Sequence, residues 1–517
     1  MNTTRRTLLT GAAALTAYAL LVPPFARRAW AQPRFSADPY TLGVASGSPR
    51  YDGVVLWTRL APQPLNADGG MPAANVEVRW EIAHDEAFRK LAGKGVATAS
   101  PDFGHSVHVE ANGLAPGRWY WYRFMAGDAV SPVGRTRTTP APDDAAPRLR
   151  YAFASCQQYE QGYYAAYRHM REEDLDLVVF LGDYIYESSW GRDHVRKHAT
   201  PEPYTLADYR IRYAQYKSDP DLKAMHAAAP WLVTWDDHEV DNDYANDRGE
   251  RLEANFLARR AAAYRAYYEH MPLRRAALPN GPDMRLYDRC AWGALAEFSV
   301  LDDRQYRSHQ VCPRHDRGGG SNVVGDQCPE RLDPKLTLLG AEQERWLTDG
   351  LAASRARWNL IAQQTLMAQL DRTAGPGQTF WTDGWDGYPA ARRRLLDFIA
   401  TRKVANPVVI GGDVHCTWVA DLKPDFDDPK SPVVATEFCG TSITSQGAGA
   451  KQVAAAMDEN PHLRFGGPKR GYLRMDVTPD RATVTLRALD TEKRADSGIS
   501  TLATFAVENG KPGPQKA

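Results

Sequence analysis

The stretch VFLGDYIYE, residues 179–187, says more about the fold of this chain than any other. An apolar strand ends there in Gly182 and Asp183, and Tyr186 stands three positions after the carboxylate. Such an ending is either a turn that happens to carry tyrosines or a metal site, because carboxylates and phenolates both bind cations. The other segments of the chain are needed to choose between the two.

Apolar strands alternate with helical segments from Tyr151 onward. The predicted strands are 149–156, 176–183, 231–235, 295–301, 357–364 and 406–412, and the clearest helix is 341–354. This alternation is typical of an α/β layered domain. The segment GYLRMDVTPDRATVTLRALD (471–490) predicts a closing hairpin with its turn at TPD.

The region 36–140 is predicted to be a separate all-β domain, since 517 residues are too many for one ordinary core. Short apolar and aromatic runs such as RWYWYRFMAG (118–127) alternate there with turn signals. Their length favours an immunoglobulin-like β-sandwich that lacks the cysteine pair of antibody domains. A linker rich in Pro, Ala and Asp (138–150) leads to a second domain, expected over 148–506.

The first 31 residues have the features of a twin-arginine signal peptide. Arg5 and Arg6 precede an apolar stretch, and Ala29-Trp30-Ala31 offers a small-x-small cleavage pattern. An uncleaved membrane anchor is the less favoured alternative, because the apolar stretch is shorter than the roughly 20 residues of a bilayer span. We therefore expect export by the twin-arginine machinery to the periplasm or beyond, with no stable membrane anchor.

The charges of the chain are balanced, with 63 Lys and Arg against 63 Asp and Glu. A nucleic-acid-binding surface would show as a basic excess or stripe, so nucleic acid is expected at most as a diester substrate. Six cysteines are destined for an oxidising compartment. Cys312 and Cys328 flank a glycine-rich stretch and are expected to pair. Cys416 and Cys439 are a second candidate pair, although the sequence leaves the pairing open.

Groups that bind metals follow the ends of the predicted strands. They are Cys156, Asp183, Tyr186, Asp236, Asp237, His238, Asp413 and His415, with Arg304 after a further strand end. Taken singly, each has an ordinary explanation, such as a turn-forming Asp or a buried Cys. Together they favour a metal site, because carboxylates gathered in one cleft are costly without a cation.

The types of donor group indicate two kinds of metal. A thiolate and a phenolate around one ion favour Fe(III). The oxygen-rich run WDDHEVDND (235–243) favours calcium or another hard cation. Such a mixed site differs from the Cys/His sites of structural zinc.

Several motifs resemble those of the PhoD-type alkaline phosphatases. They are FASCQQYEQGYYAAYRHM (153–170), LGDYIYE (181–187), WLVTWDDHEVDNDYAN (231–246), LDDRQYR (301–307), GGDVHCTWVADL (411–422) and TEFCGTSITSQG (436–447). The likeness extends over residues 36–506. It implies an exported phosphatase with an N-terminal immunoglobulin-like domain, a metallophosphatase core of two packed sheets flanked by helices, and a site holding Fe(III) and calcium.

The resemblance also implies roles for individual residues. Cys156 and Tyr186, rather than Tyr184, would bind iron, and Asp183 would bridge the two metals. The remaining implied metal positions are Asp236, Asp237, Asp413 and His415. His238 would lie beside the leaving group. Arg304 is a candidate phosphate contact, with a structural ion pair as the alternative.

The expected reaction is hydrolysis of small phosphate esters by a metal-activated hydroxide, in the service of phosphate acquisition. A phospholipase-like phosphodiesterase of the same fold is one alternative. Others are a calcium-stabilised binding protein of the envelope, and a cysteine hydrolase using Cys156 with His238 or His415.

Overall fold

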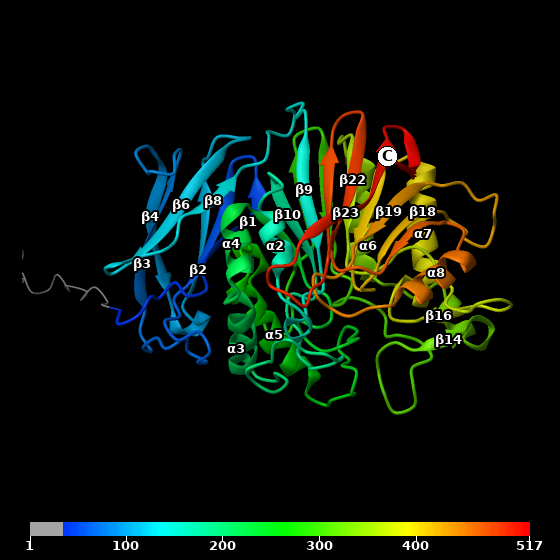
Figure 1. Ribbon diagram of the computed structural model, residues 1–517, viewed down its shortest axis with the longest axis horizontal. Coiled ribbons are helices and arrows are strands. Elements are labelled where there is room, and N and C mark those ends of the chain that lie inside the picture. Colours follow the sequence, from blue (N-terminus) through cyan, green and yellow to red (C-terminus); the bar gives the residue numbers. More distant parts are fainter. Residues whose placement is uncertain (1–34) are drawn as a thin grey trace, which may run out of the picture.

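The computed structural model describes residues 35–517. The predicted signal peptide, residues 1–31, lies outside the described residues. Two large β-sheets pack face to face in the middle of the molecule, and helices cover their outer faces (Figure 1). The predicted fold class, an α/β sandwich of two sheets preceded by an all-β part, is confirmed.

The first sheet has ten strands in the order β24-β23-β22-β21-β9-β10-β11-β1-β2-β5. Its parallel centre consists of β9 (Leu149–Ala154), β10 (Leu177–Leu181) and β11 (Trp231–Thr234). Every residue of β10 and β11 is buried, as expected for parallel strands covered on both faces. The strands β21 (Gly471–Val477) and β22 (Arg481–Leu489) form the predicted closing hairpin, which β23 (Ile499–Glu508) and β24 (Lys511–Lys516) extend.

The second sheet has seven strands in the order β12-β13-β15-β17-β19-β18-β20. They are β12 (Asp288–Trp292), β13 (Ala296–Val300), β15 (Trp358–Ala362), β17 (Pro407–Gly411), β18 (Thr417–Leu422), β19 (Ala435–Cys439) and β20 (Leu463–Gly467). An apolar core joins the two sheets, and within it the rings of Tyr151 and Phe298 meet edge to face at 5.0 Å.

Helices form the outer layers. The first sheet is covered by α2 (Ala165–Met170), α3 (Leu206–Lys217), α4 (Pro220–Ala228) and α5 (Phe256–His270), and the second by α6 (Gly340–Ala353), α7 (Pro389–Arg402) and α8 (Ala450–Glu459). The helix α3 begins at a capping box, in which Thr205 and Asp208 satisfy each other's backbone N–H groups.

The N-terminal part is a sandwich of its own that shares a sheet with the rest. Its strands are β1 (Val44–Arg50), β2 (Gly53–Arg59) and β5 (Ser106–Asn112) on one side, and β3 (Val76–Ala83), β4 (Leu91–Ala99), β6 (Trp119–Ala126), β7 (Ala129–Val130) and β8 (Gly134–Arg137) on the other. Burial alternates strictly along β6, so one of its faces packs in the core.

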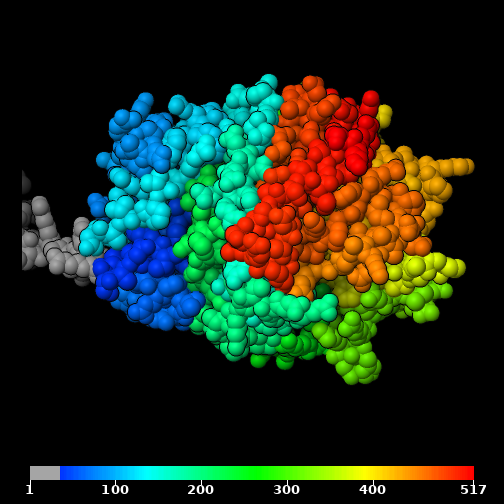
Figure 2. Space-filling model, in the orientation of Figure 1, coloured from blue at the N-terminus to red at the C-terminus, as the bar shows by residue number. Residues whose placement is uncertain are grey.

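The strand β1 also pairs with β11, through Gly47 and Trp231. A Cβ atom at Gly47 would lie 2.7 Å from the carbonyl oxygen of Trp231, so this close approach requires glycine. The N-terminal part therefore packs directly on the rest of the molecule (Figure 2).

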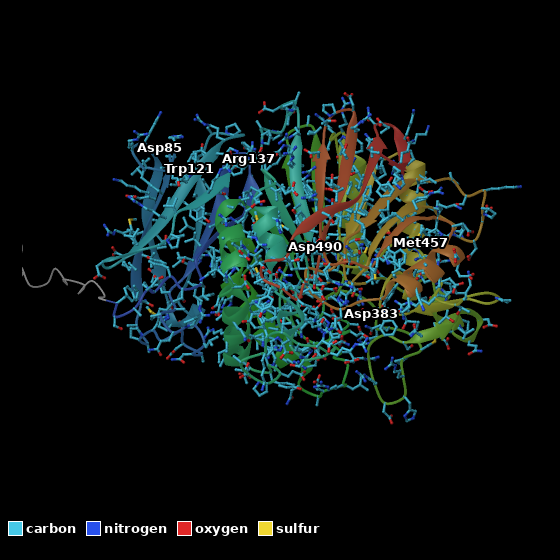
Figure 3. All side chains as sticks on the ribbon, viewed as in Figure 1. Asp85, Trp121, Arg137, Asp383, Met457 and Asp490 are labelled. Atoms are coloured by element: carbon cyan, nitrogen blue, oxygen red, sulfur yellow. A yellow bond between two sulfur atoms is a disulfide. The ribbon has the colours of Figure 1, made fainter. Side chains whose placement is uncertain are left out.

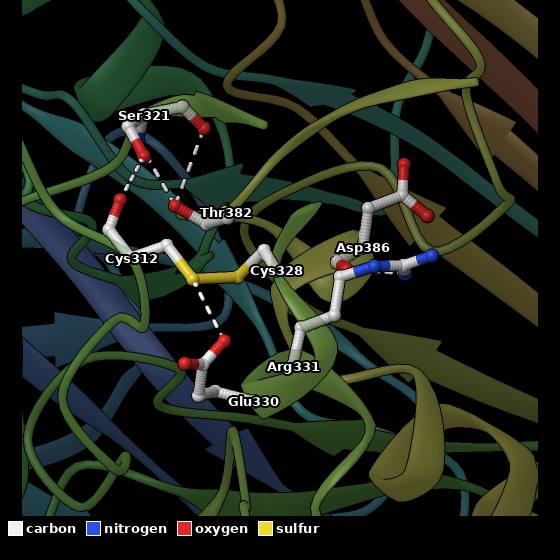
Figure 4. The surroundings of a disulfide bond; sticks show 7 residues. All are labelled: Cys312, Ser321, Cys328, Glu330, Arg331, Thr382 and Asp386. Carbon is white, nitrogen blue, oxygen red and sulfur yellow. Dashed lines mark hydrogen bonds between the residues drawn. A yellow bond between two sulfur atoms is a disulfide. The ribbon is translucent and has the colours of Figure 1, made fainter. Parts of the chain in front are cut away.

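One predicted disulfide is confirmed and the other is wrong. Cys312 and Cys328 are bonded, beside the small sheet of β14 (Asn322–Val324) and β16 (Thr379–Trp381) (Figure 4). Cys416 and Cys439 are free among the described residues, which include all six cysteines. The residue opposite Cys439 in the β18–β19 ladder is Trp418, two positions beyond Cys416, and the two thiols contact different carbonyl groups.

Candidate metal centre

The site lies where the central parallel strands end. Cys156 follows β9, Asp183 follows β10, Asp236 and Asp237 follow β11, and Asp413 follows β17. Figure 3 marks this region through Asp383, among the loops beyond the strands, whereas Asp85 and Trp121 lie at the far end of the N-terminal part. Loops from both sheets converge there, as they do at ligand sites of α/β proteins.

Several of these residues have an unusual backbone conformation. The φ angles of Cys156, Asp183, Asp413 and His415 are 58°, 59°, 65° and 54°. Non-glycine residues in this left-handed region cost about 1–3 kcal/mol each, and such strain is concentrated at functional sites.

A first group of donors combines sulfur, nitrogen and oxygen. Ligand atoms of Cys156, Asp183 and His415 lie within 4.8 Å of one another. The Tyr186 hydroxyl joins them, 2.7 Å from Asp183 Oδ2 and 3.2 Å from His415 Nε2. Tyr184 instead points into the core, where its hydroxyl is 2.8 Å from His226 Nε2. Tyr186 is therefore the tyrosine of this site.

Carboxylates continue the site in two further groups. Asp183 also lies within 4.8 Å of Asp237 and His238, and Asp237 in turn belongs to a group with Asp243 and Asp383. Shared members thus link the three groups into a continuous row of donors. Asp243 belongs to the acidic run noted in the sequence, but Asp383, beyond β16, follows none of the predicted strands and carried no sequence signal.

Arg304 lies beneath this row as an ion-pair partner. Its guanidinium bonds to Asp236 at 2.5 Å and to Asp383 at 2.7 Å, and it lies 3.6 Å from Asp237. Its side chain is only 1% exposed. Arg304 thus forms ion pairs, the alternative given above to a contact with phosphate. Its two shorter bonds occupy Nε and Nη1, and the side chain is buried away from solvent.

His238 is held by a carboxylate that the sequence reasoning did not assign. Its Nδ1 lies 2.7 Å from Glu187 Oε2, and the ring packs 4.1 Å from that of Tyr186. Burial disfavours the charged imidazole, but Glu187, Asp237 and Asp183 outweigh it and raise the pKa of His238 well above its usual value. The one feature of the sequence that pointed to Glu187 was its position directly after Tyr186.

The electrostatics of the site fit a bound cation. Burial, reinforced by Asp237 and Glu239 against the charge of His238, raises the pKa of Asp183 well above its usual value. Asp236 Oδ2 and Asp237 Oδ1 are buried and have no hydrogen-bond partner among residues 35–517. Buried carboxylate oxygens without a hydrogen bond are costly, and a cation removes the cost.

The outer edge of the site is formed by Asp413 and His415, which are half-buried. Burial raises the pKa of Asp413 to about 6, and its carboxylate accepts a hydrogen bond from Thr365. Burial and the charge of Arg470 lower the pKa of His415 to about 3, so its imidazole is neutral, as a metal ligand must be. Trp190 stacks on this imidazole at 5.6 Å and covers one side of it.

Two packed sheets with a row of thiol, phenol, imidazole and carboxylate donors at their strand ends define a hydrolase of the metallophosphatase class. A model of the PhoD-like phosphatase family matches residues 151–486, and the model of its N-terminal domain matches residues 26–140. The chain belongs to the PhoD-like phosphatase family and is a phosphoric ester hydrolase.

Two relatives show how far the similarity extends. Alkaline phosphatase D of Bacillus subtilis (strain 168) is 50% identical over 499 residues, which are 94% of this chain and 84% of that protein. A solved structure of PhoD superposes with a TM-score of 0.89 at 49% identity, covering 94% of this chain and 93% of that one. Membership of a phosphatase family argues against the alternative that the chain is a calcium-stabilised binding protein of the envelope. Within residues 35–517, no helix is long and apolar enough to cross a membrane.

Proposed function

We propose that this phosphatase is exported and hydrolyses phosphate esters for phosphate acquisition, at a mixed centre that holds Fe(III) and calcium. The observation that carries the proposal is the row of donors: sulfur and phenol oxygen lie at one end, carboxylates alone at the other, and Asp183 belongs to both neighbouring groups. Asp183, grouped with Cys156 on one side and with Asp237 on the other, would be a ligand shared by the two ions.

Cys156, Tyr186 and His415 would hold iron together with Asp183. Burial raises the pKa of the Cys156 thiol and of the Tyr186 phenol well above their usual values. A cation favours the thiolate and the phenolate against the effect of burial, and a highly charged ion such as Fe(III) does so most strongly. The same burial argues against Cys156 as a free nucleophile, which requires a lowered pKa.

Asp237, Asp243 and Asp383 would hold calcium, since hard cations prefer carboxylate oxygens. Asp236, neutralised by Arg304, and Asp413, at the rim, would complete the acidic surroundings. When bound, the two metals supply an activated water and neutralise charge on the phosphoryl oxygens.

His238 would hold the proton for the leaving oxygen of the ester. Because Glu187 occupies Nδ1, the free nitrogen is Nε2, and the hydrogen bond fixes the direction in which it points. Arg304 would act indirectly, by holding Asp236 and Asp383 in position.

The test is elemental analysis of enzyme exported through its own signal. Iron equimolar with protein, accompanied by calcium, is the expected result, together with loss of activity on chelation. Zinc alone, or no transition metal, would overturn the assignment of Cys156 and Tyr186. Assays with p-nitrophenyl phosphate and bis(p-nitrophenyl) phosphate then compare monoester with diester. Lysine in place of both Arg5 and Arg6 should retain the enzyme inside the cell if export is by the twin-arginine route.

A further inference from the structure

A cavity lies apart from the metal centre, where the N-terminal part meets the catalytic sheets. Its volume is about 370 Å³, within the range of small-molecule sites. Three segments surround it: the end of β1 (48–50), the chain after α5 (273–277) and the stretch 285–290 that leads into β12. The residues that line it, all within 35–517, include none of the candidate metal ligands.

Arginines dominate the polar part of its wall. Arg50, Arg274, Arg285 and Arg289 line the cavity, and Asp288 is the single acidic residue of the lining. Arg50 and Asp288 are 3.9 Å apart, beyond hydrogen-bonding distance. Arg285 is exposed and lies over the ring of Tyr287, 4.6 Å from its centre. It forms no ion pair with a carboxylate of the described chain.

The two inner arginines are held in place but keep unused donors. Arg274 is anchored through Ser48 and Glu110, at 2.8 and 3.3 Å, and Arg289 through the carbonyl group of Trp346. The Nε atoms of both are buried and have no hydrogen-bond partner among residues 35–517, although Arg289 Nε lies 4.0 Å from the Glu297 carboxylate. Burial and the charge of Arg50 lower the pKa of Arg274, a cost that a bound anion would relieve.

The floor of the cavity is apolar. Leu232, Leu286 and Val300 line it, and each keeps a small exposed fraction, between 4% and 7%. Leu232 and Val300 belong to the core between the two sheets, and Leu286 belongs to the core between the first sheet and its helices. A ligand of this cavity therefore meets positive charge at the wall and hydrocarbon beneath.

We propose that this arginine cavity binds an amphiphilic oxyanion, that is, a small molecule with a sulfate, phosphate or carboxylate head and an apolar body. Arginine suits such a head because its planar donors pair with two oxygens at once. The apolar body would displace water from Leu232 and Val300. The cavity is a binding site separate from the centre that hydrolyses phosphate esters.

The test is calorimetric titration of the metal-loaded enzyme with octyl sulfate, below the concentration at which it forms micelles. One site per chain is expected. Replacing the two outer arginines, as Arg50→Gln/Arg285→Gln, should weaken binding by about tenfold or more while leaving kcat and KM for p-nitrophenyl phosphate unchanged. Arg89→Gln is the matched control, since Arg89 is an exposed arginine 3.4 Å from Asp85 in the same N-terminal part.

Two further ligands separate the contribution of the charged head to binding from that of the apolar body. Octyl glucoside, which has the same chain and no charge, should not bind, and inorganic sulfate should bind more weakly than octyl sulfate. Equal binding of octyl sulfate by the double variant and the wild type would overturn the proposal. So would an equal loss in Arg89→Gln, or competitive inhibition with an inhibition constant equal to the Kd, which would place octyl sulfate in the metal centre.

Discussion

Nδ1 of His238 lies 2.7 Å from Oε2 of Glu187, and both side chains are buried. The other oxygen of Glu187 accepts a hydrogen bond from the backbone N–H of Asn242, at 3.2 Å. Glu187 therefore ties the loop after β10 to the loop after β11 at the point where the imidazole must be aimed. A carboxylate in this position selects the tautomer of the histidine and fixes its ring.

His238→Ala should lower kcat by about 100-fold to 10,000-fold, the usual contribution of general acid–base catalysis. Iron and calcium should remain bound, because the proposed role of His238 is to hold a proton. The measurements are kcat and the iron and calcium content of the same preparation of the variant. Loss of a metal together with activity would show that His238 is a ligand, as its proximity to Asp183 and Asp237 also permits.

Glu187→Gln should lower kcat by about 10-fold to 100-fold, a typical effect of losing the group that orients a site histidine. Because Glu187 raises the pKa of His238 against the effect of burial, its removal lowers that pKa. If His238 must be protonated, activity is then lost at a lower pH than in the wild type. The measurement is the alkaline limb of the kcat–pH profile.

Glu202→Gln is the control for Glu187→Gln. Carboxylate oxygens of Glu187, Glu202 and Asp241 lie within 4.8 Å of one another, but Glu202 pairs with Arg259 at 2.7 Å. Its replacement should leave the alkaline limb where it is in the wild type. An equal shift in both variants would mean that general charge, and not the contact with His238, sets the profile.

Tyr186→Phe should reduce the iron content, and Tyr184→Phe should not. Only the hydroxyl of Tyr186 reaches Asp183 and His415, whereas that of Tyr184 faces His226. Both variants remove one buried hydroxyl, so a comparison of their iron-to-protein ratios separates ligation from stability. Full iron in Tyr186→Phe would remove the phenolate from the ligand set.

Cys312→Ser/Cys328→Ser should destabilise the enzyme by about 2–4 kcal/mol, the usual effect of opening a loop of this length. The bridged segment also carries Gly320, whose N–H donates to Asp243 at 2.9 Å. We therefore expect weaker calcium retention as well. Urea unfolding and a calcium titration test the two effects, and unchanged values in both would show that the bridge has no part in either.

Lys217→Met should stabilise the protein most at low pH. Burial lowers the pKa of Lys217 from 10.5 to about 7, which corresponds to a cost of about 5 kcal/mol for the charged lysine. Below pH 7 the lysine is charged in both the folded and the unfolded protein, so the full free-energy cost of burying its charge is present. Between pH 7 and 10.5 only the unfolded state binds the proton, so wild-type stability rises with pH.

The gain from Lys217→Met is therefore expected at pH 6 and should vanish near pH 10.5, as measured by denaturant unfolding at both values. Lys223→Met on the neighbouring helix α4 is the control, since Lys223 is half-buried and donates to the carbonyl group of Thr41. A gain of equal size at both pH values would mean that packing, and not the charge, is responsible.

The sequence was a good guide wherever a feature is local. Alternating or continuous apolar runs marked the strands β9, β10, β11 and β17, and the residues after them became the site, because strand period and turn chemistry depend on near neighbours. Tyr186, which the sequence favoured over Tyr184, lies beside Asp183, whereas Tyr184 faces His226. The disulfide of Cys312 and Cys328 likewise closes a short loop.

The tertiary structure decided which loops meet. Asp383 joins Asp237 and Asp243 from a segment that follows none of the predicted strands. Arg304 forms ion pairs with Asp236 and Asp383, and Cys416 lies two positions of register away from Cys439. The arginine cavity exists only because the N-terminal part adds β1 to the catalytic sheet. Contacts of this kind depend on how distant segments pack, which a pattern of neighbouring residues does not encode.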